Sequence, residues 1–277
     1  MGESILLRFW GVRGSTPTPV QENLRYGGNT SCVEVRVGRE ILILDCGTGI
    51  RLLGHALCRE FGKHPIRAQI FLSHYHWDHI QGIPFFTPLY RPSDSFVFHS
   101  FRSPEADVQQ ALEYQMNNPY FPVDMQAMRA RRRFVHIDEQ AFRLGKLRIA
   151  TRRLNHPQGC LGLRAELNGK VFVYATDTEP GDPRGDQNVR VLAEGADVLI
   201  YDAQYTPQEY RTGKQNWGHS TWEEGVKIAR EAKVKKLILF HHDPDHNDKH
   251  IDSIVREAKK HFAATVGARE GLTIHLK

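Results

Sequence analysis

Three imidazoles and a carboxylate follow directly on a short apolar run, residues 68–72, which has the length and composition of a buried strand. On an extended or tightly turning backbone, His74 and His76 project to one side, while Asp78 and His79 lie beside them. This spacing suits two adjacent divalent metals better than one. Imidazole with carboxylate favours zinc, with manganese or iron as alternatives. A histidine-rich loop that binds nothing is the other interpretation, and the preceding strand disfavours it.

The composition predicts one globular domain. A chain of 277 residues with 40% hydrophobic content can bury a full core, and no linker or low-complexity segment interrupts it, so we expect a single domain over 1–277. No apolar run approaches the length of about 18 residues that a membrane span needs, so we expect no membrane partner. The four cysteines lie far apart, which predicts buried thiols in a reducing compartment, the cytoplasm.

Charge gives a weaker indication of the partner. The formal net charge of +5 is compatible with an anionic substrate. The one dense basic run, residues 129–133, is either a solvated strand edge or a contact for phosphate.

Strand and helix patterns alternate along the whole chain, which predicts an α/β fold in which helices cover the sheets. We expect a tight hairpin at Asn168 and Gly169. Strands are expected at 5–10, 33–37, 41–45, 68–72, 96–99, 161–167, 170–175, 198–202 and 236–240, with a meander over 134–154. Helices are expected at 50–61, 104–116, 189–194, 221–232 and 248–262.

The arrangement of His74, His76, Asp78 and His79 resembles the H-x-H-x-D-H signature of the metallo-β-lactamase superfamily. The resemblance implies an αβ/βα sandwich of four layers, with two facing mixed sheets and a binuclear metal site at one edge. Asp45 begins a turn similar to the D-x-G turn of this superfamily, in which the aspartate supports the metal loop without binding metal. The signature is specific for the fold and says little about the substrate.

The resemblance also implies three further ligands, each after a strand. His156 and Asp177 are similar to the third-motif histidine and the bridging aspartate of the phosphodiesterase branch. The last ligand is His241 or His242, and position relative to the preceding strand favours His241. The implied set places His74, His76 and His156 on the first metal, Asp78, His79 and His241 on the second, and Asp177 between them.

Residues 216–221 resemble the H-S-T motif of the same branch, in which the histidine faces the scissile phosphate. The resemblance therefore implies a catalytic His219, with Ser220 and Thr221 at the substrate. Capping of the following helix accounts for the two hydroxyls by itself, but it does not account for His219. Asp202, which we expect to orient His219, occupies a position where the family has glutamate.

Other substrate contacts are expected from two loops. Arg13, Ser15 and Asn29 are similar to the glycine-rich first loop and the N-x-S segment of the phosphodiesterase branch, although they can also serve only to shape turns. Residues 117–123 hold two prolines and adjacent aromatics. They form either a lid, with Tyr120 stacking on a base, or a packed connection.

Spacing within the family then indicates a small substrate. Transfer-RNA 3′ endonucleases carry a long arm between the third-motif histidine and the bridging aspartate, whereas His156 and Asp177 are separated by little more than one hairpin. We therefore expect a binuclear phosphodiesterase that hydrolyses a cyclic nucleotide or related cyclic phosphate. The implied mechanism is attack by hydroxide held between two metals, with Asp78 accepting a proton and His219 assisting the leaving oxygen.

Three alternatives stay open at this point. An RNA-processing endonuclease of the transfer-RNA 3′ type makes nucleic acid a possible but less favoured partner. A metal-binding signalling module would keep the ligands without catalysis. A thiolester or lactam hydrolase is disfavoured by the segment around His219. Phosphodiesterases of this branch are often dimers, which implies a homodimer.

Overall fold

The computed structural model describes residues 3–277, so Met1 and Gly2 of the predicted domain lie outside the described residues. Two seven-stranded sheets face each other. The first consists, in spatial order, of β14 (Thr273–Leu276), β1 (Ile5–Gly11), β2 (Cys32–Val37), β3 (Glu40–Leu44), β4 (Arg67–Phe71), β5 (Ser95–Ser100) and β6 (Arg131–His136). The second consists of β13 (Thr265–Gly267), β12 (Leu237–Phe240), β11 (Val198–Asp202), β10 (Lys170–Ala175), β9 (Cys160–Leu167), β8 (Leu147–Leu154) and β7 (Ala141–Leu144).

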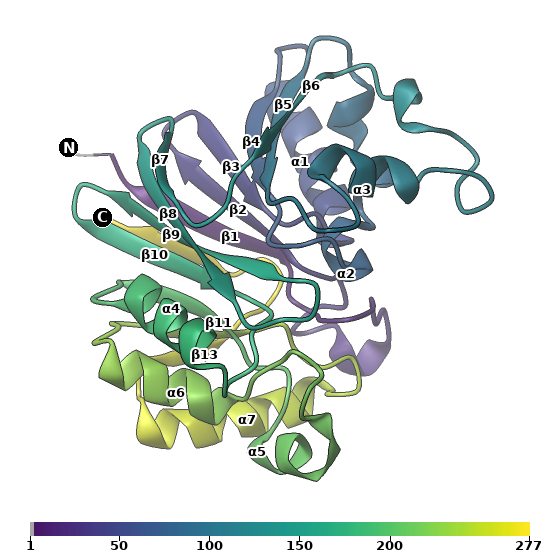
Figure 1. Ribbon diagram of the computed structural model, residues 1–277. Helices are drawn as coiled ribbons and strands as arrows, with labels where there is room; N and C mark the ends of the chain where they lie inside the picture. Colours follow the sequence, from purple (N-terminus) through teal and green to yellow (C-terminus); the bar gives the residue numbers. More distant parts are fainter. Residues whose placement is uncertain (1–2) are drawn as a thin grey trace.

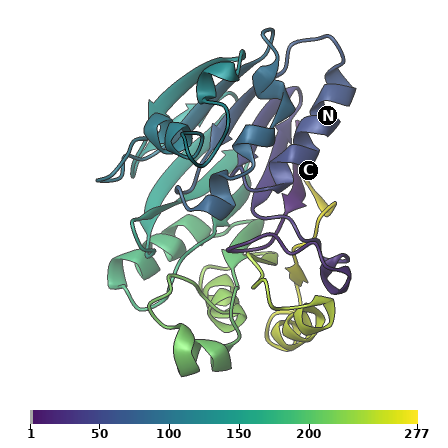
Figure 2. The same ribbon diagram turned by 90° about the vertical axis from the view of Figure 1, so that its right-hand side faces the viewer.

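Helices cover the outer face of each sheet (Figures 1 and 2). The first sheet carries α1 (Gly49–Phe61) and α3 (Val108–Tyr114), and the second carries α4 (Pro183–Ala193), α6 (Trp222–Glu231) and α7 (Asp248–His261). Two short helices, α2 (Trp77–Ile80) and α5 (Pro207–Glu209), lie in loops. The predicted four-layer sandwich with two mixed sheets is therefore confirmed. Among the helices of residues 3–277, none has both the length and the apolar character needed to span a membrane.

Burial along the strands explains how the layers form. In β1, buried and half-buried residues alternate, as expected for a strand with one face in the core. Every residue of β11 and β12 is buried, because these parallel strands are covered on both faces. The hairpin at Asn168 and Gly169 is confirmed, and both residues have positive φ, as a two-residue turn of this kind requires.

The core between the sheets is aromatic at its centre. The ring of Phe9 in β1 lies 6.0 Å from that of Phe240 in β12, and Phe240 lies 5.7 Å from Tyr174 in β10. All three side chains are fully buried. Residues from both sheets thus form one continuous cluster, which fixes the distance between the sheets.

Strand direction places the chemically important loops together. β3, β4 and β5 are parallel in the first sheet, and β10, β11 and β12 are parallel in the second. β8 runs in the same direction as β10, because both are antiparallel to β9. The loops after these carboxyl ends meet at one edge of the sandwich, where ligands of open α/β sheets usually bind.

Two predicted helices have different bounds. The helix expected at 104–116 is only Val108–Tyr114, because the side chain of Asp107 caps it in a reciprocal capping box with Gln110, leaving Pro104 in the preceding turn. The helix expected at 189–194 begins earlier, at Pro183, where Asp182 provides the cap.

The predicted meander over 134–154 is wrong in its first part. β6 pairs in parallel with β5 at the edge of the first sheet, and within 134–154 only β7 and β8 pair with each other in antiparallel fashion, in the second sheet. The basic run 129–133 enters β6 at the end of the sheet opposite the carboxyl-end loops. The guanidinium of Arg132 donates to the carbonyls of Met128 and Ala130, whereas Arg129, Arg131 and Arg133 are exposed at the edge of the sheet.

Phe9→Ala tests the shared core. The substitution removes a buried ring from the contact between the sheets, and we expect it to lower the free energy of unfolding by about 3–5 kcal/mol. Urea denaturation followed by circular dichroism measures the loss. Leu24→Ala, at a side chain that is 64% exposed, is the control and should change stability by less than about 0.5 kcal/mol. Equal effects of the two substitutions would contradict a core shared by the sheets.

Candidate metal centre

Four strand ends and their loops bring the predicted donors into one cluster. His74 and His76 follow β4, and the short helix α2 carries Asp78 and His79. The remaining donors come from the second sheet, where His156 follows β8, Asp177 follows β10 and His241 follows β12.

The first group of donors is His74, His76 and His156, whose ring nitrogens all lie within 4.8 Å of one another. The Nε2 atom of His156 lies 3.0 Å from Nδ1 of His76. The Nε2 atom of His74 is buried and has no hydrogen-bond partner within residues 3–277. Because a buried polar atom without a partner is costly, this nitrogen is suited to bind a cation at the centre of the group.

The second group is Asp78, His79 and His241. The Oδ2 atom of Asp78 lies 3.0 Å from Nε2 of His241 and 3.2 Å from Nε2 of His79. The two imidazole nitrogens are 3.2 Å apart. Three donors at these separations can hold one divalent cation.

Asp177 lies between the two groups and turns one carboxylate oxygen to each. Its Oδ1 atom is 3.3 Å from Nε2 of His79 and 3.4 Å from Nε2 of His241. Its Oδ2 atom is 3.5 Å from Nε2 of His74 and 3.7 Å from Nε2 of His156. This arrangement can bridge two cations.

Each histidine of the cluster uses its other ring nitrogen for a hydrogen bond to the protein, which fixes the tautomer that a metal ligand requires. The acceptors are Ser73 Oγ for His74, Gln158 Oε1 for His76, Asp45 Oδ2 for His79, the Gly218 carbonyl for His156 and Gln204 Oε1 for His241. Burial lowers the pKa of His74 well below its usual range and that of His156 to about 4. Both imidazoles are therefore neutral, the form that binds metal.

The structure brings His241 into this cluster and leaves His242 outside it. The ring of His242 is buried against Tyr26 and donates to the carbonyl of Ala268. The two neighbours point in different directions because His241 has a left-handed backbone, with φ at 60°.

His219 lies against the cluster and is held by Asp202. Its Nδ1 atom is 2.9 Å from Oδ2 of Asp202, so the shorter carboxylate does reach the ring. Burial alone would lower the pKa of His219, but the charge and hydrogen bond of Asp202 outweigh it and raise the pKa to about 9. The ring stacks on that of His241 at a centroid distance of 5.0 Å. Because Asp202 binds Nδ1, Nε2 is the nitrogen of His219 that is available to a ligand.

Comparison with known proteins decides the family. A family model described as the β-lactamase superfamily domain matches residues 39–242. The chain belongs to this superfamily.

Sequence relatives include ribonucleases Z. One from Brevibacillus brevis is 37% identical over 101 residues, which cover 35% of this chain and only 30% of that protein. Another from Picrophilus torridus is 23% identical over 322 aligned residues, which cover 100% of this chain and 97% of that protein. The family and this likeness agree with the predicted metal-dependent hydrolase.

Solved structures share the fold. The metallo-β-lactamase fold protein YhfI from Bacillus subtilis has a TM-score of 0.73 at 21% identity and covers 99% of both chains. A diphosphatase of the PhnP family has a TM-score of 0.71 at 18% identity, covering 99% of this chain and 98% of the other.

Of the residues predicted to contact substrate in this β-lactamase superfamily member, Ser15 lies at the metal cluster. Its backbone N–H donates to Asp78 Oδ2 at 2.8 Å. Arg13 does not reach the site, because its guanidinium is fully buried and donates to the carbonyls of Gly27, Asp243 and His246. The Arg13 side chain therefore links its own loop to the loops that contain these three carbonyls.

The other predicted contacts are also occupied by the protein. The side-chain amide of Asn29 donates to both oxygens of Glu270. The hydroxyl of Ser220 is fully buried and bonds to that of Tyr201, and the hydroxyl of Thr221 caps α6. Structural roles therefore account for these three side chains.

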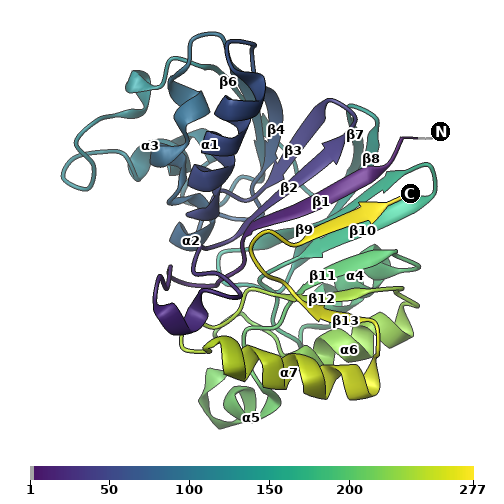
Figure 3. The same cartoon turned by 180° about the vertical axis from the view of Figure 1, so that it is seen from behind.

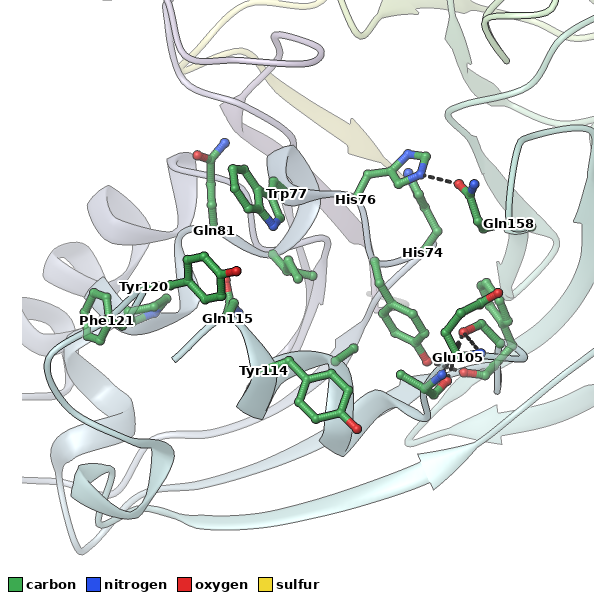
Figure 4. Close-up of a pocket in the computed structure, with 18 of the residues that line it drawn as sticks. His74, His76, Trp77, Gln81, Glu105, Tyr114, Gln115, Tyr120, Phe121 and Gln158 are labelled. Carbon is green, nitrogen blue, oxygen red and sulfur yellow. Dashed lines mark hydrogen bonds between the residues drawn. The ribbon is translucent and has the colours of Figure 1, made fainter. Parts of the chain in front are cut away.

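Tyr120 lies in a large pocket that opens beside His74 and His76. The pocket has a volume of about 720 Å³ and a largely aromatic lining that includes Trp77 and Phe121. Figure 4 shows Trp77 and Tyr120 towards one end and His76 and its partner Gln158 towards the other. Trp77 and Tyr120 are 72% and 76% exposed, which leaves both rings accessible to a ligand.

Glu179, a buried carboxylate behind the cluster, was not among the residues predicted from the sequence. It accepts hydrogen bonds from the backbone N–H groups of Asn216 and Gly218, at 2.6 and 2.7 Å, and from the hydroxyl of Tyr210. Gly218 in turn accepts from His156, so Glu179 fixes the segment that orients His156. The sequence carries no signal for this role, because the partners are backbone groups distant along the chain.

Glu179→Gln tests this function of Glu179. Glutamine keeps the size but presents an amide nitrogen to one of the two N–H groups, so we expect the 216–218 segment to shift and metal affinity to fall about 10–100-fold. Metal content after dialysis against a graded chelator series measures the change. Glu223→Gln, at an exposed side chain of α6, is the control. Unchanged affinity in Glu179→Gln would contradict the assignment.

Proposed function

We propose that the chain is a binuclear phosphodiesterase that cleaves a phosphodiester attached to a nucleoside. The pocket beside His74 and His76 carries this proposal, because it adjoins the metal centre and its volume of about 720 Å³ accommodates a base and ribose. Exposed aromatic rings such as Trp77 and Tyr120 stack on bases without sequence preference. The side-chain amide nitrogen of Gln115 is buried in the same pocket and has no hydrogen-bond partner in the part of the chain that the structure describes, so it can donate to a base acceptor.

The cluster would hold two divalent cations, and its donor set favours zinc. His74, His76 and His156 would hold one, Asp78, His79 and His241 the other, and Asp177 would contact both. Bound cations at such a site activate water and neutralise charge on the phosphate oxygens.

The protein's own groups complete the reaction. Asp78 has one oxygen held by the Ser15 N–H and His241, and its second oxygen can accept a proton from the attacking water. Asp202 fixes His219 so that Nε2 can donate a proton to the leaving oxygen. The aromatic pocket holds the nucleoside and excludes water from the adjoining side of the phosphate.

We place RNA first among the substrates, ahead of the small cyclic phosphate that the motifs predict. The support is the alignment over the whole chain with a relative named ribonuclease Z. A cyclic nucleotide is the second candidate, because a single hairpin separates His156 from Asp177 and the pocket fits one nucleoside.

The experiment compares RNA carrying a 3′ extension with a panel of 2′,3′- and 3′,5′-cyclic nucleotides, using zinc- and manganese-loaded protein. We expect cleavage of at least one class, abolished by chelator and by His74→Ala. Faster turnover of the cyclic panel by orders of magnitude would place the small substrate first. No cleavage of either class by fully metallated protein would overturn the proposed function.

His219→Ala is expected to reduce kcat about 10²–10⁴-fold, the usual contribution of a general acid, while both metals stay bound. Single-turnover kinetics and metal analysis measure the two effects. His64→Ala, at an exposed loop histidine, is the control and should leave kcat unchanged. A loss of metal parallel to the loss of kcat would argue against a direct role in proton transfer.

Tyr120→Ala removes one stacking surface of the pocket. Because stacking on an aromatic ring contributes about 1–3 kcal/mol per base, we expect KM to rise at least fivefold with little change in kcat. Steady-state kinetics on the preferred substrate measure this, with Leu24→Ala as the control at an exposed apolar side chain outside the pocket. An unchanged KM would mean that the base binds elsewhere.

A further inference from the structure

We infer that the chain has a third metal site, formed by Glu209, His246 and His250. The ligand atoms of these residues all lie within 4.8 Å of one another, and the group shares no residue with the metal centre described above. The three side chains come from α5, from the loop after β12 and from the first turn of α7. Figures 1 and 3 show α5 close to the start of α7.

Glu209 is already oriented as a ligand. One of its carboxylate oxygens, Oε2, accepts from both the backbone N–H and the hydroxyl of Thr206, each at 2.7 Å, in the capping box of α5. The other oxygen, Oε1, lies 2.9 Å from Nε2 of His246. A carboxylate that is itself held by hydrogen bonds loses little freedom when it binds a metal.

Backbone contacts fix both histidines. His246 is 5% exposed, and its carbonyl accepts a hydrogen bond from the buried guanidinium of Arg13 at 2.6 Å. Asn247 caps α7 by accepting from the backbone N–H of His250 at 3.0 Å. His246 precedes this N-cap and His250 lies in the first turn of α7, and their rings stack at a centroid distance of 4.1 Å.

The separations suit zinc. Donors at 2.0–2.2 Å from a tetrahedral zinc ion are about 3.4 Å from one another, so the 2.9 Å pair and the 4.8 Å limit bracket the required geometry. The ring of His250 stacks on that of His246 at 4.1 Å, and it must turn to face the ion. It can do so because it is exposed and makes no hydrogen bond within residues 3–277.

The charges around the group favour a cation on balance. Besides Glu209, the carboxylate of Asp243 acts on His250. The positive charge of Arg13 disfavours a cation here, but its guanidinium donates to the backbone carbonyls of Asp243 and His246. Two imidazoles with carboxylate form a donor set of the kind that binds zinc in proteins.

A metal here would join α5 to α7. The segment between β11 and α6 contains α5 and two residues at the metal centre. These are His219 and Gln204, and Gln204 contacts His241. A zinc ion would therefore fix the position of this segment. The inference does not depend on the proposed function, because it concerns binding outside the cluster that carries the chemistry.

The test is the zinc stoichiometry of the full chain, measured by plasma mass spectrometry after equilibration in a Zn²⁺ buffer. We expect the wild-type chain to hold one zinc ion more than His250→Ala, which means three against two when the metal centre holds both of its cations. His275→Ala, at an exposed histidine on β14, is the control and should keep three. The same number of zinc ions in the wild type and in His250→Ala would overturn the inference.

Thermal unfolding provides a second measurement. Starting from protein with two zinc ions, further Zn²⁺ should raise the Tm of the wild type and of His275→Ala, but not that of His250→Ala. The same rise in all three proteins would also overturn the inference. Neither experiment measures phosphodiesterase activity. Failure of the third site can therefore be distinguished from failure of the proposed function.

Discussion

The buried carboxylate of Asp45 is the interaction on which the metal centre depends. It accepts hydrogen bonds from the N–H and hydroxyl of Ser73, from Nδ1 of His79 and from the hydroxyl of Tyr174, at 2.7–2.8 Å. Burying a carboxylate is costly unless its acceptor capacity is used, and here four donors use it. Because Tyr174 lies on β10, the strand that leads to Asp177, this one group fixes the metal loop of the first sheet to the second sheet.

The metal centre is divided between the sheets. The first sheet supplies His74, His76, Asp78 and His79, and the second supplies His156, Asp177 and His241. Neither sheet can bind the proposed pair of cations alone. Metal binding is therefore linked to the packing of one sheet on the other, since a ligand that binds only the native state stabilises it. The interface between the sheets is stabilised by the aromatic contact between Phe9 and Phe240, and bound metal would stabilise the same interface.

The sequence predicted the fold and the donor cluster because each donor follows an apolar strand, and parallel strands deliver their ends to one edge. It could not predict Glu179, Gln158 or Gln204, whose roles depend on backbone groups and rings that only the tertiary structure brings near. Motif identity also says nothing of side-chain direction, which is why Ser220 and Arg13 were expected at the substrate but are buried. The strand β13 has only three residues, too few to give a strand pattern in the sequence.

Three functional strand ends, at Asp45, Asp177 and His241, have left-handed backbones with φ between 51° and 60°. Aspartate, asparagine and histidine tolerate this conformation better than other residues with side chains, and β-branched residues tolerate it poorly. Selection for folding alone would therefore retain such residue types at these positions, even in a descendant that had lost catalysis. His74 and His156 have no such backbone requirement. In an inactive descendant, these two histidines would be free to drift first, so they report on activity more faithfully than the aspartates do.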